Sequence, residues 1–516
     1  MANYQIPGVY VTQSGTSLTT TSTTPLNVAI VADQVTLAAQ TDTFNNVVAT
    51  SGIIIGTFSQ PMAITTSTGN YASYSGYTVT WVSGTTTVTG AHGVNFTVST
   101  PSGSAFSYLT TSGTTSGIGL PSGTVSVTYA NQWGAYGTYG SFNSVANALG
   151  TAVNGTVITN PAVLAAQFAF QNGANTVQIL PVARVSSSGQ SAASVTDWAR
   201  TFAITSSGVA SDPTYLTNFN NIDTIVPLYS FVNSAGQATT SAVSSGINTY
   251  LNAQQAIGSY QRAFIGVDGT AGQITSGQLQ TLAASFSNVV GQTGSTRVTL
   301  AFPGSINYNP GLNSTTGLSN VNFNIPGYYL AAALAGLFVG QPTVATPITN
   351  KIVAGFNAIG NQISLNDAQT NYLPYGITTV YQKRDGNLWV LQGLTTNVTS
   401  WLTKEISLNA IGDVLSNNVA DDLNKSYLIG GPLTQNTLAG VLGTVQGTLI
   451  NAIGTKIIQS YQNLLYSVNP ASPTTVNVTF QYSPTYPINY IQVTLSLNTQ
   501  TGTIVTTNQQ SNLAVY

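Results

Sequence analysis

The sequence contains no cysteine and very few charged residues. Without cysteine it can form neither a disulfide bond nor a thiolate metal site, and it can fold in a reducing cytoplasm. Asp, Glu, Lys and Arg together make up 4% of the 516 residues, against about 25% in an average soluble protein. A monomer relies on surface charge to stay dispersed, and the formal net charge is only −2. The composition therefore favours a protein whose surface is covered by copies of itself.

Charge is missing altogether from long parts of the chain. No charged residue occurs between Asp42 and Arg184, and the last one is Lys456. The sequence has no cluster of Lys and Arg that could bind a phosphate backbone or a membrane surface. We therefore expect a protein partner and no nucleic acid.

Long apolar stretches and a secretion signal are also missing. Met1 to Gly8 lacks the basic and apolar regions of a signal peptide, so secretion by the usual route is not expected. The longest strongly apolar stretch, from Tyr328 to Val339, is shorter than the roughly 20 residues that a membrane-spanning helix needs. The sequence predicts a soluble protein without membrane insertion.

Side chains that enzymes use for catalysis are scarce. His92 is the only histidine, and a triad base would need a positioned carboxylate, but no Asp or Glu lies between Asp42 and Asp197. An ordinary turn residue is the better interpretation of His92. The Gly-x-Ser-x-Gly pattern of an α/β hydrolase, the alternative enzyme class for such a chain, does not occur.

Two other candidate sites have plainer explanations. The glycines between Gly266 and Gly272 have neither dinucleotide-binding nor P-loop spacing, which indicates a simple loop. Asp421 and Asp422 are adjacent but have no third ligand in view, which favours a solvated turn over a cation site. We therefore predict that the protein is not an enzyme and binds no cofactor or metal.

The residues that are present predict several domains. Hydrophobic residues make up 42% of the chain, enough for a sizeable core, and the length suits roughly three or four domains. Ile6 to Val11 reads as a short strand, and the polar run from Thr12 to Thr24 has little to bury, which together indicate an extended arm. From about Thr50 to Thr138 the chain is rich in Thr, Ser, Gly and Tyr with strand-like alternation, which predicts an inserted antiparallel β domain.

The middle of the chain alternates between strand and helix patterns. Asn160 can cap a helix that begins at Pro161 and ends at Gly173. Further strands are expected over residues 176–182, 222–228, 262–267 and 297–302, and further helices over residues 241–257 and 276–290. This order implies βαβ crossovers and a mostly parallel sheet covered on both faces.

The last third of the chain mixes helices with strands. We expect a helix from Tyr328 to Phe338, a strand within residues 386–394 and a largely helical stretch from Leu433 to Leu465. Apolar and polar residues then alternate over residues 476–482 and 491–497, and a turn over residues 498–502 leads into a last short strand.

Four segments of the chain resemble motifs that occur, in the same order, in one known protein family. The opening Tyr4 to Val11 resembles the family's PGVYV-type segment, and Phe168 to Arg184 resembles its helix ending in NGG with the strand that follows. The Ala332 to Lys351 region resembles an AxxAG helix and a threonine-containing turn, and Asp385 to Thr396 resembles a strand and turn ending in GxTT. In this order they resemble the tail sheath proteins of contractile phages and related injection machines, and they cover most of the chain outside the predicted insertion. The chain departs from the family in having Asn-Gly-Ala at 172–174 and in its lack of charge.

The resemblance implies an α/β (α+β overall) protein with a mostly parallel-sheet α/β core, a β-rich inserted domain, a C-terminal α+β region and extended arms. The implied division is an N-terminal arm at 1–25, the N-terminal part of the sheath core at 26–49 with 139–185, an inserted domain at 50–138, an α/β core at 186–385, a C-terminal domain facing the tube at 386–497 and a C-terminal arm at 498–516.

The resemblance also implies a function and partners. Subunits of this family stack as hexameric rings around a tail tube and contract to drive it through a bacterial envelope for genome delivery. The partners would be further copies, the tail tube protein, and baseplate and tail terminator proteins, in a virion component assembled in the host cytoplasm. No nucleotide is required, because heterologous contacts can store energy in a less stable packing.

Residues for these contacts follow from the same resemblance. Arm strands would pair with neighbouring subunits through Ile6, Pro7, Gly8, Val9, Tyr10 and Val11 at one end and Ile491, Val493, Leu495, Leu497, Thr503, Ile504, Val505 and Thr506 at the other. Lys404, Glu405 and Asp413 are candidates to face the tube.

A secreted surface-layer or adhesin-type protein is the alternative structural interpretation. Such proteins are also rich in Thr, Ser and Gly, and the sequons at Asn95, Asn397 and Asn477 are formal glycosylation acceptors. The missing signal peptide and the α/β pattern both count against it.

Overall fold

The computed structural model describes residues 26–33, 40–47, 54–58, 77–83, 85–89, 96–99, 107–111, 122–129, 137–150, 152–154, 157–158, 160–182, 193–203, 216, 219, 222–233, 236–238, 241–269, 274–287, 294–304, 306–309, 323–360, 362–426, 428–469, 472, 474–488, 494–497 and 504–507. The predicted N-terminal arm and His92 lie outside these residues, so the structure does not test them.

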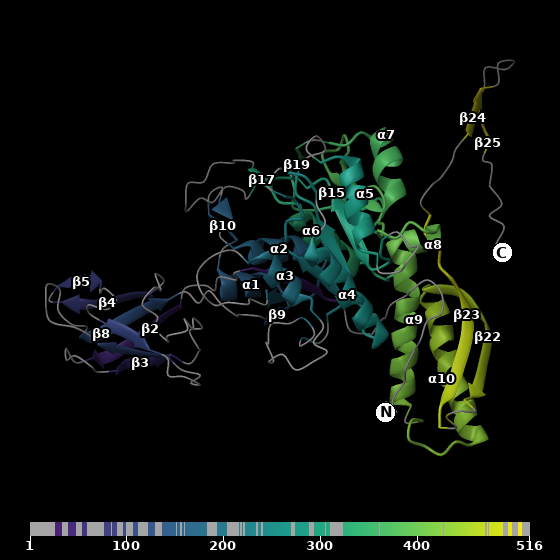
Figure 1. The fold of residues 1–516 in the computed structure, drawn as a ribbon, viewed down its shortest axis with the longest axis horizontal. Coiled ribbons are helices and arrows are strands. Elements are labelled where there is room, and N and C mark those ends of the chain that lie inside the picture. Colours follow the sequence, from purple (N-terminus) through teal and green to yellow (C-terminus); the bar gives the residue numbers. More distant parts are fainter. Residues whose placement is uncertain are drawn as a thin grey trace.

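A nine-stranded sheet forms the centre of the molecule (Figure 1), with the strand order β18-β21-β20-β15-β14-β13-β1-β12-β9. Six neighbouring strands run parallel: β20 (Ile377–Gln382), β15 (Val298–Phe302), β14 (Arg262–Gly266), β13 (Thr224–Pro227), β1 (Val28–Ala32) and β12 (Val177–Pro181). Antiparallel strands flank these six: β9 (Gly137–Tyr139) at one edge, and β21 (Leu388–Val390) with β18 (Ile352–Val353) at the other. The predicted α/β core with a mostly parallel sheet is confirmed.

Strand β1 shows how the sequence produces two apolar layers. Its five residues are all buried, as expected for a strand covered on both faces. Because successive side chains point to opposite faces, Val28 and Ile30 join one apolar cluster, whereas Ala29 and Val31 join the other. The sheet therefore separates two cores.

Helices cover both faces of the sheet. The first core contains α1 (Phe142–Leu149), α2 (Pro161–Gln171) and α6 (Tyr328–Val339). The second contains α3 (Val195–Thr201), α4 (Ala242–Ala256) and α5 (Ser276–Ser285). The predicted start of α2 is confirmed, because the Asn160 side chain accepts a hydrogen bond from the backbone N–H of Ala162 and Pro161 is the first helical residue.

Two of the sequence motifs meet where α2 crosses α6. Gly336 of α6 lies so close to Ala169 that an added Cβ would collide with the carbonyl oxygen of Ala169. One turn later, a Cβ on Gly340 would lie 2.8 Å from the backbone of Gly173, which itself has φ of +109°. Glycine is therefore needed here for close backbone approach, and at Gly173 also for the left-handed conformation that ends α2.

A separate group of antiparallel strands lies on the left in Figure 1. One sheet contains β2 (Gln40–Val47), β8 (Gly123–Tyr129), β4 (Tyr77–Ser83) and β5 (Thr86–Thr89), in that order. The other contains β3 (Ile54–Phe58), β7 (Ser107–Thr111) and β6 (Phe96–Ser99). Val79, Trp81 and Val125 are buried within the first sheet, so the predicted strand alternation corresponds to a small core.

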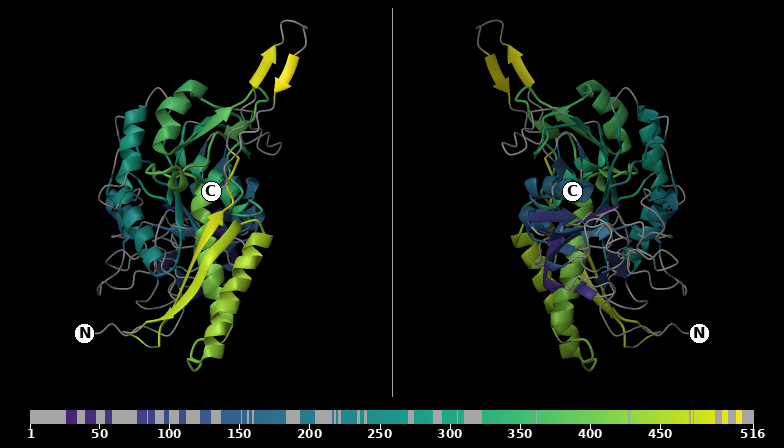
Figure 2. Two further views of the ribbon diagram at one scale, coloured as in Figure 1. Left: turned by 90° about the vertical axis from the view of Figure 1, so that its right-hand side faces the viewer. Right: turned by 90° about the vertical axis from the view of Figure 1, so that its left-hand side faces the viewer.

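The C-terminal unit comprises α8 (Trp401–Lys404), α9 (Ile406–Lys425), α10 (Gln435–Gly454), β22 (Ile458–Val468) and β23 (Val476–Pro484). Two views at right angles to Figure 1 show the β22–β23 hairpin lying along the two long helices (Figure 2). The prediction of helix up to Leu465 is wrong beyond Gly454, because the chain turns at Lys456, which has φ of +60°, and enters a strand that pairs with β23.

Shorter elements complete the described fold. Small sheets are formed by β10 (Val153–Asn154) with β11 (Val157–Ile158), and by β17 (Phe323–Ile325), β16 (Ile306–Tyr308) and β19 (Ala358–Ile359). The turn of α7 (Leu365–Asp367) continues into η2 (Ala368–Tyr372) and η3 (Leu373–Tyr375). The hairpin of β24 (Thr494–Leu497) and β25 (Ile504–Thr507) projects away from the rest of the chain in Figure 2.

Candidate assembly surfaces

The β22–β23 hairpin is a two-stranded sheet whose outer edges are unpaired among the described residues. The strands pair from Ile458 opposite Pro484 to Val468 opposite Val476, with shifts in register near Ser460 and between Gln462 and Leu465. The backbone N–H and C=O groups along an unpaired edge can accept a strand from another chain. The hairpin is therefore a candidate site for strand addition.

One face of this hairpin packs on the rest of the subunit. Tyr461, Leu464, Val478 and Phe480 are half-buried against the first apolar core. Leu465, by contrast, is 62% exposed. The hairpin is anchored on one side and exposes Leu465 beside polar side chains such as Asn477 and Gln481 on the other.

Helix α10 has an uncharged and mostly exposed surface. No charged residue occurs among its 20 residues, and Ile450 is 55% exposed. By length and apolar composition it is the one helix in the described chain that could cross a membrane. Val445 and Leu449, however, are fully buried, which ties α10 into the subunit. Its outer face suits a protein partner.

Exposed apolar residues concentrate in this part of the chain. Ten of the sixteen large exposed hydrophobic side chains in the described residues lie between Trp401 and Ile488. Two of these rings, Trp401 and Tyr486, contact each other with their centroids 5.3 Å apart. The C-terminal unit therefore exposes more large apolar side chains than the rest of the described chain, as a subunit that joins other proteins would.

The predicted C-terminal strands are described in part. Leu495 and Leu497 lie in β24, where Leu495 pairs with Thr506, and Leu497 pairs with Ile504. Val505 also lies in β25. Ile491, Val493 and Thr503, together with Ile6, Pro7, Gly8, Val9, Tyr10 and Val11, lie outside the described residues, so their role in pairing stays a prediction.

The three residues predicted to face the tube have different environments. Asp413 has no exposed surface, and Glu405 is 3% exposed and contacts Gln392 and Ser407. Buried side chains cannot touch a separate protein, so the prediction is wrong for these two residues. Lys404 is half-buried, and its contact with a tube stays a prediction.

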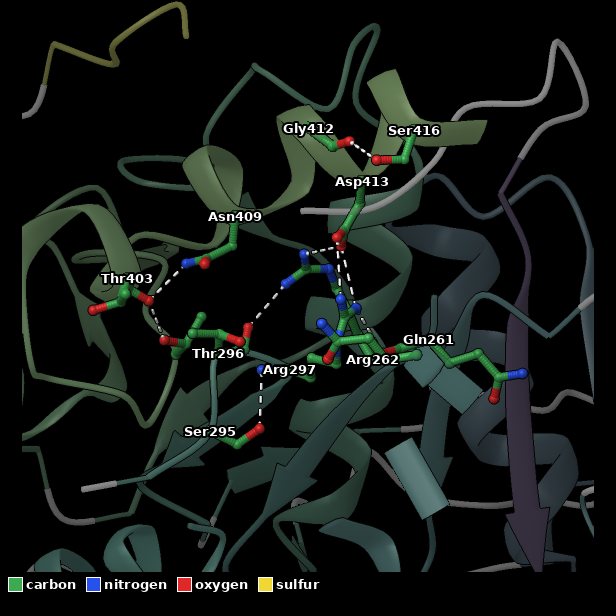
Figure 3. A network of polar contacts seen from close by, with 12 residues as sticks. Gln261, Arg262, Ser295, Thr296, Arg297, Thr403, Asn409, Gly412, Asp413 and Ser416 are labelled. Atoms are coloured by element: carbon green, nitrogen blue, oxygen red, sulfur yellow. Dashed lines mark hydrogen bonds and ion pairs between the residues drawn. The ribbon is translucent and has the colours of Figure 1, made fainter. Parts of the chain in front are cut away.

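Asp413 instead forms an internal ion cluster with Arg262 and Arg297 (Figure 3). Its Oδ2 accepts hydrogen bonds from Arg262 Nη2 at 2.8 Å and from Arg297 Nη1 at 3.2 Å, and its Oδ1 accepts one from Arg297 Nη2 at 3.1 Å. Asp413 lies on α9, whereas the arginines lie at the beginning of β14 and just before β15. The cluster joins the C-terminal unit to the central sheet.

Burial governs the protonation of this cluster. It raises the pKa of Asp413 to about 6, while the positive charges of Arg297 and Arg262 act in the opposite direction. Burial also lowers the pKa of Arg262 to about 10, opposed by the charge of Asp413. Both pKa values leave Asp413 and Arg262 mainly charged at neutral pH, so their contact is an ion pair.

The GxTT segment lies beside the ion cluster. The Thr396 hydroxyl accepts a hydrogen bond from the backbone N–H of Ser295 at 2.8 Å and donates one to the Ser295 carbonyl at 3.1 Å. The Thr395 hydroxyl donates to the Thr403 carbonyl at 2.6 Å, and this carbonyl also accepts from the Asn409 side chain. The motif therefore connects the segment just before β15 to α8 and the beginning of α9.

Two further candidate sites from the sequence take part in structural contacts. Asp421 and Asp422 lie on α9 and not in a turn, where Asp421 is 3.8 Å from Lys425 and Asp422 accepts a hydrogen bond from Thr448. Gly266 is required by close packing, because a Cβ there would collide with the backbone of Gly327. In the described part of the chain, no three acidic or histidine side chains gather as a metal site would require.

An open groove of about 720 Å³ lies beside α7. Its lining includes Tyr381, Lys383 and Arg384. The Lys383 ammonium lies 3.7 Å from the centre of the Trp389 ring and donates a hydrogen bond to Asn350, so it is held in a structural contact.

Sequence reasoning missed helix α9 and the two arginines that it contacts. Its apolar residues Leu408, Ile411 and Leu415 are spaced at three and four positions, which is a helical pattern. The arginines carry a weaker signal, since each opens a strongly apolar strand segment. A charged residue directly before a buried strand is a hint of a buried partner.

No protein-family model matches the chain. The tail sheath protein of Mycobacterium phage Bxz1 is 29% identical over 248 residues, which cover 48% of this chain and 40% of that protein. The match therefore spans less than half the length of the curated relative.

Solved structures extend the comparison to the fold. The cryo-EM structure of the anti-feeding prophage helical sheath in its contracted state matches with a TM-score of 0.50 and 12% identity, over 96% of this chain and 100% of that one. A crystal structure of a sheath tail protein from Listeria innocua matches with a TM-score of 0.44 and 13% identity, over 68% and 90% of the two chains. Together with the curated relative, the full-length fold match confirms that this chain resembles the contractile tail sheath proteins, as its four motifs predicted.

Proposed function

We propose that this chain is a structural subunit of a contractile tail sheath, in a phage tail or a related injection system. The observation that carries the proposal is the C-terminal unit, where an open-edged hairpin lies among most of the exposed large apolar side chains. A dispersed monomer would have to hide such a surface, whereas a polymer covers it. The similarity to a phage tail sheath protein supports a sheath as the kind of polymer.

Subunits would join through different surfaces on each copy. Such heterologous contacts close into rings or continue as helices, and we expect stacked hexameric rings around a tail tube. An arm strand from one subunit would add to the β22–β23 edge of another, because backbone hydrogen bonding does not require charge. This mode of contact suits a chain with 4% charged residues.

The C-terminal unit would lie toward the tube. The uncharged outer face of α10 can contact a tube protein through apolar side chains such as Ile450 and Ile453. The tube, baseplate and tail terminator proteins are the expected partners, and no nucleic acid or membrane is required. The protein would be a virion component that assembles in the host cytoplasm.

Contraction would use energy stored at assembly, without catalysis. Bistable interfaces differ by a few kcal/mol per subunit, which adds over a long lattice to a large and effectively irreversible release. The folded subunits would rotate as rigid bodies while the strand links hold them together. The released energy would drive the tube through a bacterial envelope for genome delivery.

Electron microscopy of the purified, concentrated protein, with and without its tube protein, tests the proposal. We expect hollow striated tubes of uniform width. Discrete monomers under both conditions would contradict a sheath function. Recovery of the protein from intact cell surfaces, in place of phage particles, would support the surface-layer alternative.

A further inference from the structure

The C-terminal unit is held to the central sheet by two kinds of contact. Apolar residues of α9, including Ile406, Ile411 and Val414, belong to the same buried cluster as α2 and α6. The Arg262, Arg297 and Asp413 cluster lies within this contact. Apolar burial is non-directional, so it stabilises the contact between α9 and the sheet without fixing the angle between them. Hydrogen-bonded ion pairs do depend on angle.

The two arginines are fixed to the sheet independently of α9. Arg262 Nη1 donates a hydrogen bond to the Thr296 carbonyl at 3.2 Å, and its guanidinium lies 5.9 Å from the centre of the Phe338 ring. Arg297 Nε donates to Gln255 Oε1 at 2.9 Å, and its guanidinium lies 5.3 Å from the centre of the Tyr260 ring. The central sheet therefore presents a preformed cationic fork.

Asp413 engages this fork with both carboxylate oxygens. Arg297 meets Oδ1 and Oδ2 through its two terminal nitrogens, and Arg262 adds a third hydrogen bond to Oδ2 (Figure 3). A bidentate contact constrains the carboxylate plane as well as its distance. Because Asp413 lies midway along α9, this constraint also limits the rotation and sliding of the helix against the sheet.

Stability alone does not explain such a cluster. Replacing a buried ion cluster by apolar residues of similar volume is often neutral or stabilising. The cluster contains two cations and one anion with side-chain exposures of 5%, 1% and 0%, and Arg262 Nε has no hydrogen-bond partner. Because burying these charges costs desolvation free energy, the cluster is better explained by a structural specificity that it provides than by added stability.

We propose that Arg262, Arg297 and Asp413 are positioning residues that fix the orientation of the C-terminal unit relative to the central sheet. The proposal rests on the proposed function in one respect: a fixed orientation presents the β22–β23 edge to neighbouring subunits at one angle. In a lattice that repeats one contact many times, a small variation in that angle would accumulate along the tube.

The test measures an intramolecular distance distribution. Since the chain has no cysteine, Ala284→Cys on α5 and Gln446→Cys on α10 give two unique spin-label sites, both exposed. Full-length labelled protein is diluted into unlabelled protein, so that pulsed dipolar spectroscopy reports distances within one subunit. The labelled double-cysteine protein with an intact ion cluster should give one narrow distance distribution.

The informative variant is the apolar replacement Arg262→Met, Arg297→Met and Asp413→Leu. We expect it to keep its melting temperature within a few degrees while its distance distribution widens at least twofold. The single variant Arg262→Met leaves Arg297 paired with Asp413 and should widen the distance distribution less. Asp421→Asn, which removes an exposed ion pair on the same helix, is the matched control and should change nothing.

A narrow, unchanged distribution in the apolar triple variant would overturn the proposal and reduce the cluster to a packing role. If the triple variant does not melt cooperatively, the single variant Arg297→Met, which removes the bidentate contact with Asp413, decides alone, and an unchanged width again overturns the proposal. The measurement is made within one subunit, so it does not depend on tube formation. Failure to form tubes would contradict the proposed function and leave this inference standing.

Discussion

The central α/β region and the C-terminal unit use apolar residues in different ways. In the central region α6 is buried along almost its whole length, and β1 is buried on both faces. In the C-terminal unit α10 buries five of its 20 residues, and β22 buries only its first residue. The same uncharged composition thus forms a closed core in one region and an open surface in the other. Apolar content alone does not reveal whether a residue stabilises the subunit or joins it to another.

The largest expected effect concerns assembly. Deletion of Met1 to Val11 should leave a folded subunit with an unchanged melting temperature that forms no long tubes, because the strand that would pair with a neighbouring hairpin is lost. Electron microscopy and thermal unfolding of the same preparation measure both properties. Tubes of wild-type length from the truncated protein would refute strand exchange.

Two identical substitutions on helices should have opposite effects in the two regions. Gly336→Ala in α6 should lower the free energy of unfolding by about 3 kcal/mol, because the new methyl group collides with the Ala169 backbone. Gly443→Ala in α10 should raise it by up to about 1 kcal/mol, because the added Cβ meets nothing within 4 Å and alanine favours helix. Urea unfolding measures both free energies. A loss of stability on Gly443→Ala would show that this position of α10 is packed against other residues and not open to a partner.

Removing exposed apolar surface should separate assembly from stability. Leu465→Thr on the hairpin should change the free energy of unfolding by less than about 0.5 kcal/mol but raise the critical concentration for assembly about tenfold. Ile257→Thr, at a 75% exposed position just after α4, is the matched control in the central region. Sedimentation of polymer across a concentration series checks both variants, and equal effects would contradict a special role for the hairpin.

The smallest expected effect is a pH dependence within the central region. Burial raises the pKa of Asp223 to about 6, against a value of 3.8 for the free group. The folded state therefore binds a proton more readily than the unfolded state, so this group favours folding more at pH 5 than at pH 7. The difference is about 1 kcal/mol.

Asp223→Asn isolates that contribution. The substitution keeps an acceptor oxygen for the backbone N–H of Asn27 but removes the titration. Relative to this variant, the wild-type free energy of unfolding should rise by about 1 kcal/mol between pH 7 and pH 5. Urea unfolding at both pH values measures it, and a constant difference between the two proteins would contradict the raised pKa.

Much of the central region could be predicted from the sequence, because its signals are local. The caps of α2 at Asn160 and Gly173, the apolar run of β1 and the helical pattern of α6 each occupy one short segment. Their alternation along the chain was enough to predict a mostly parallel sheet.

The C-terminal unit was harder to predict, because its structure depends on distant contacts. Asp413 lies 151 residues from Arg262 and 116 from Arg297, and no local pattern joins them. Beyond Gly454, a mixture of Ile, Leu and Tyr suits helix or strand equally well, and pairing with β23 decides between them. The exposure of Ile450 and Leu465 depends on which surfaces the rest of the subunit leaves uncovered, and the sequence alone does not specify these.

A helical cryo-EM reconstruction of assembled tubes tests the central claim most directly. The account predicts that a strand from another copy of the chain lies along an edge of the β22–β23 hairpin in every subunit. A reconstruction in which both hairpin edges are unpaired, with subunits joined only through their α/β cores, would contradict it.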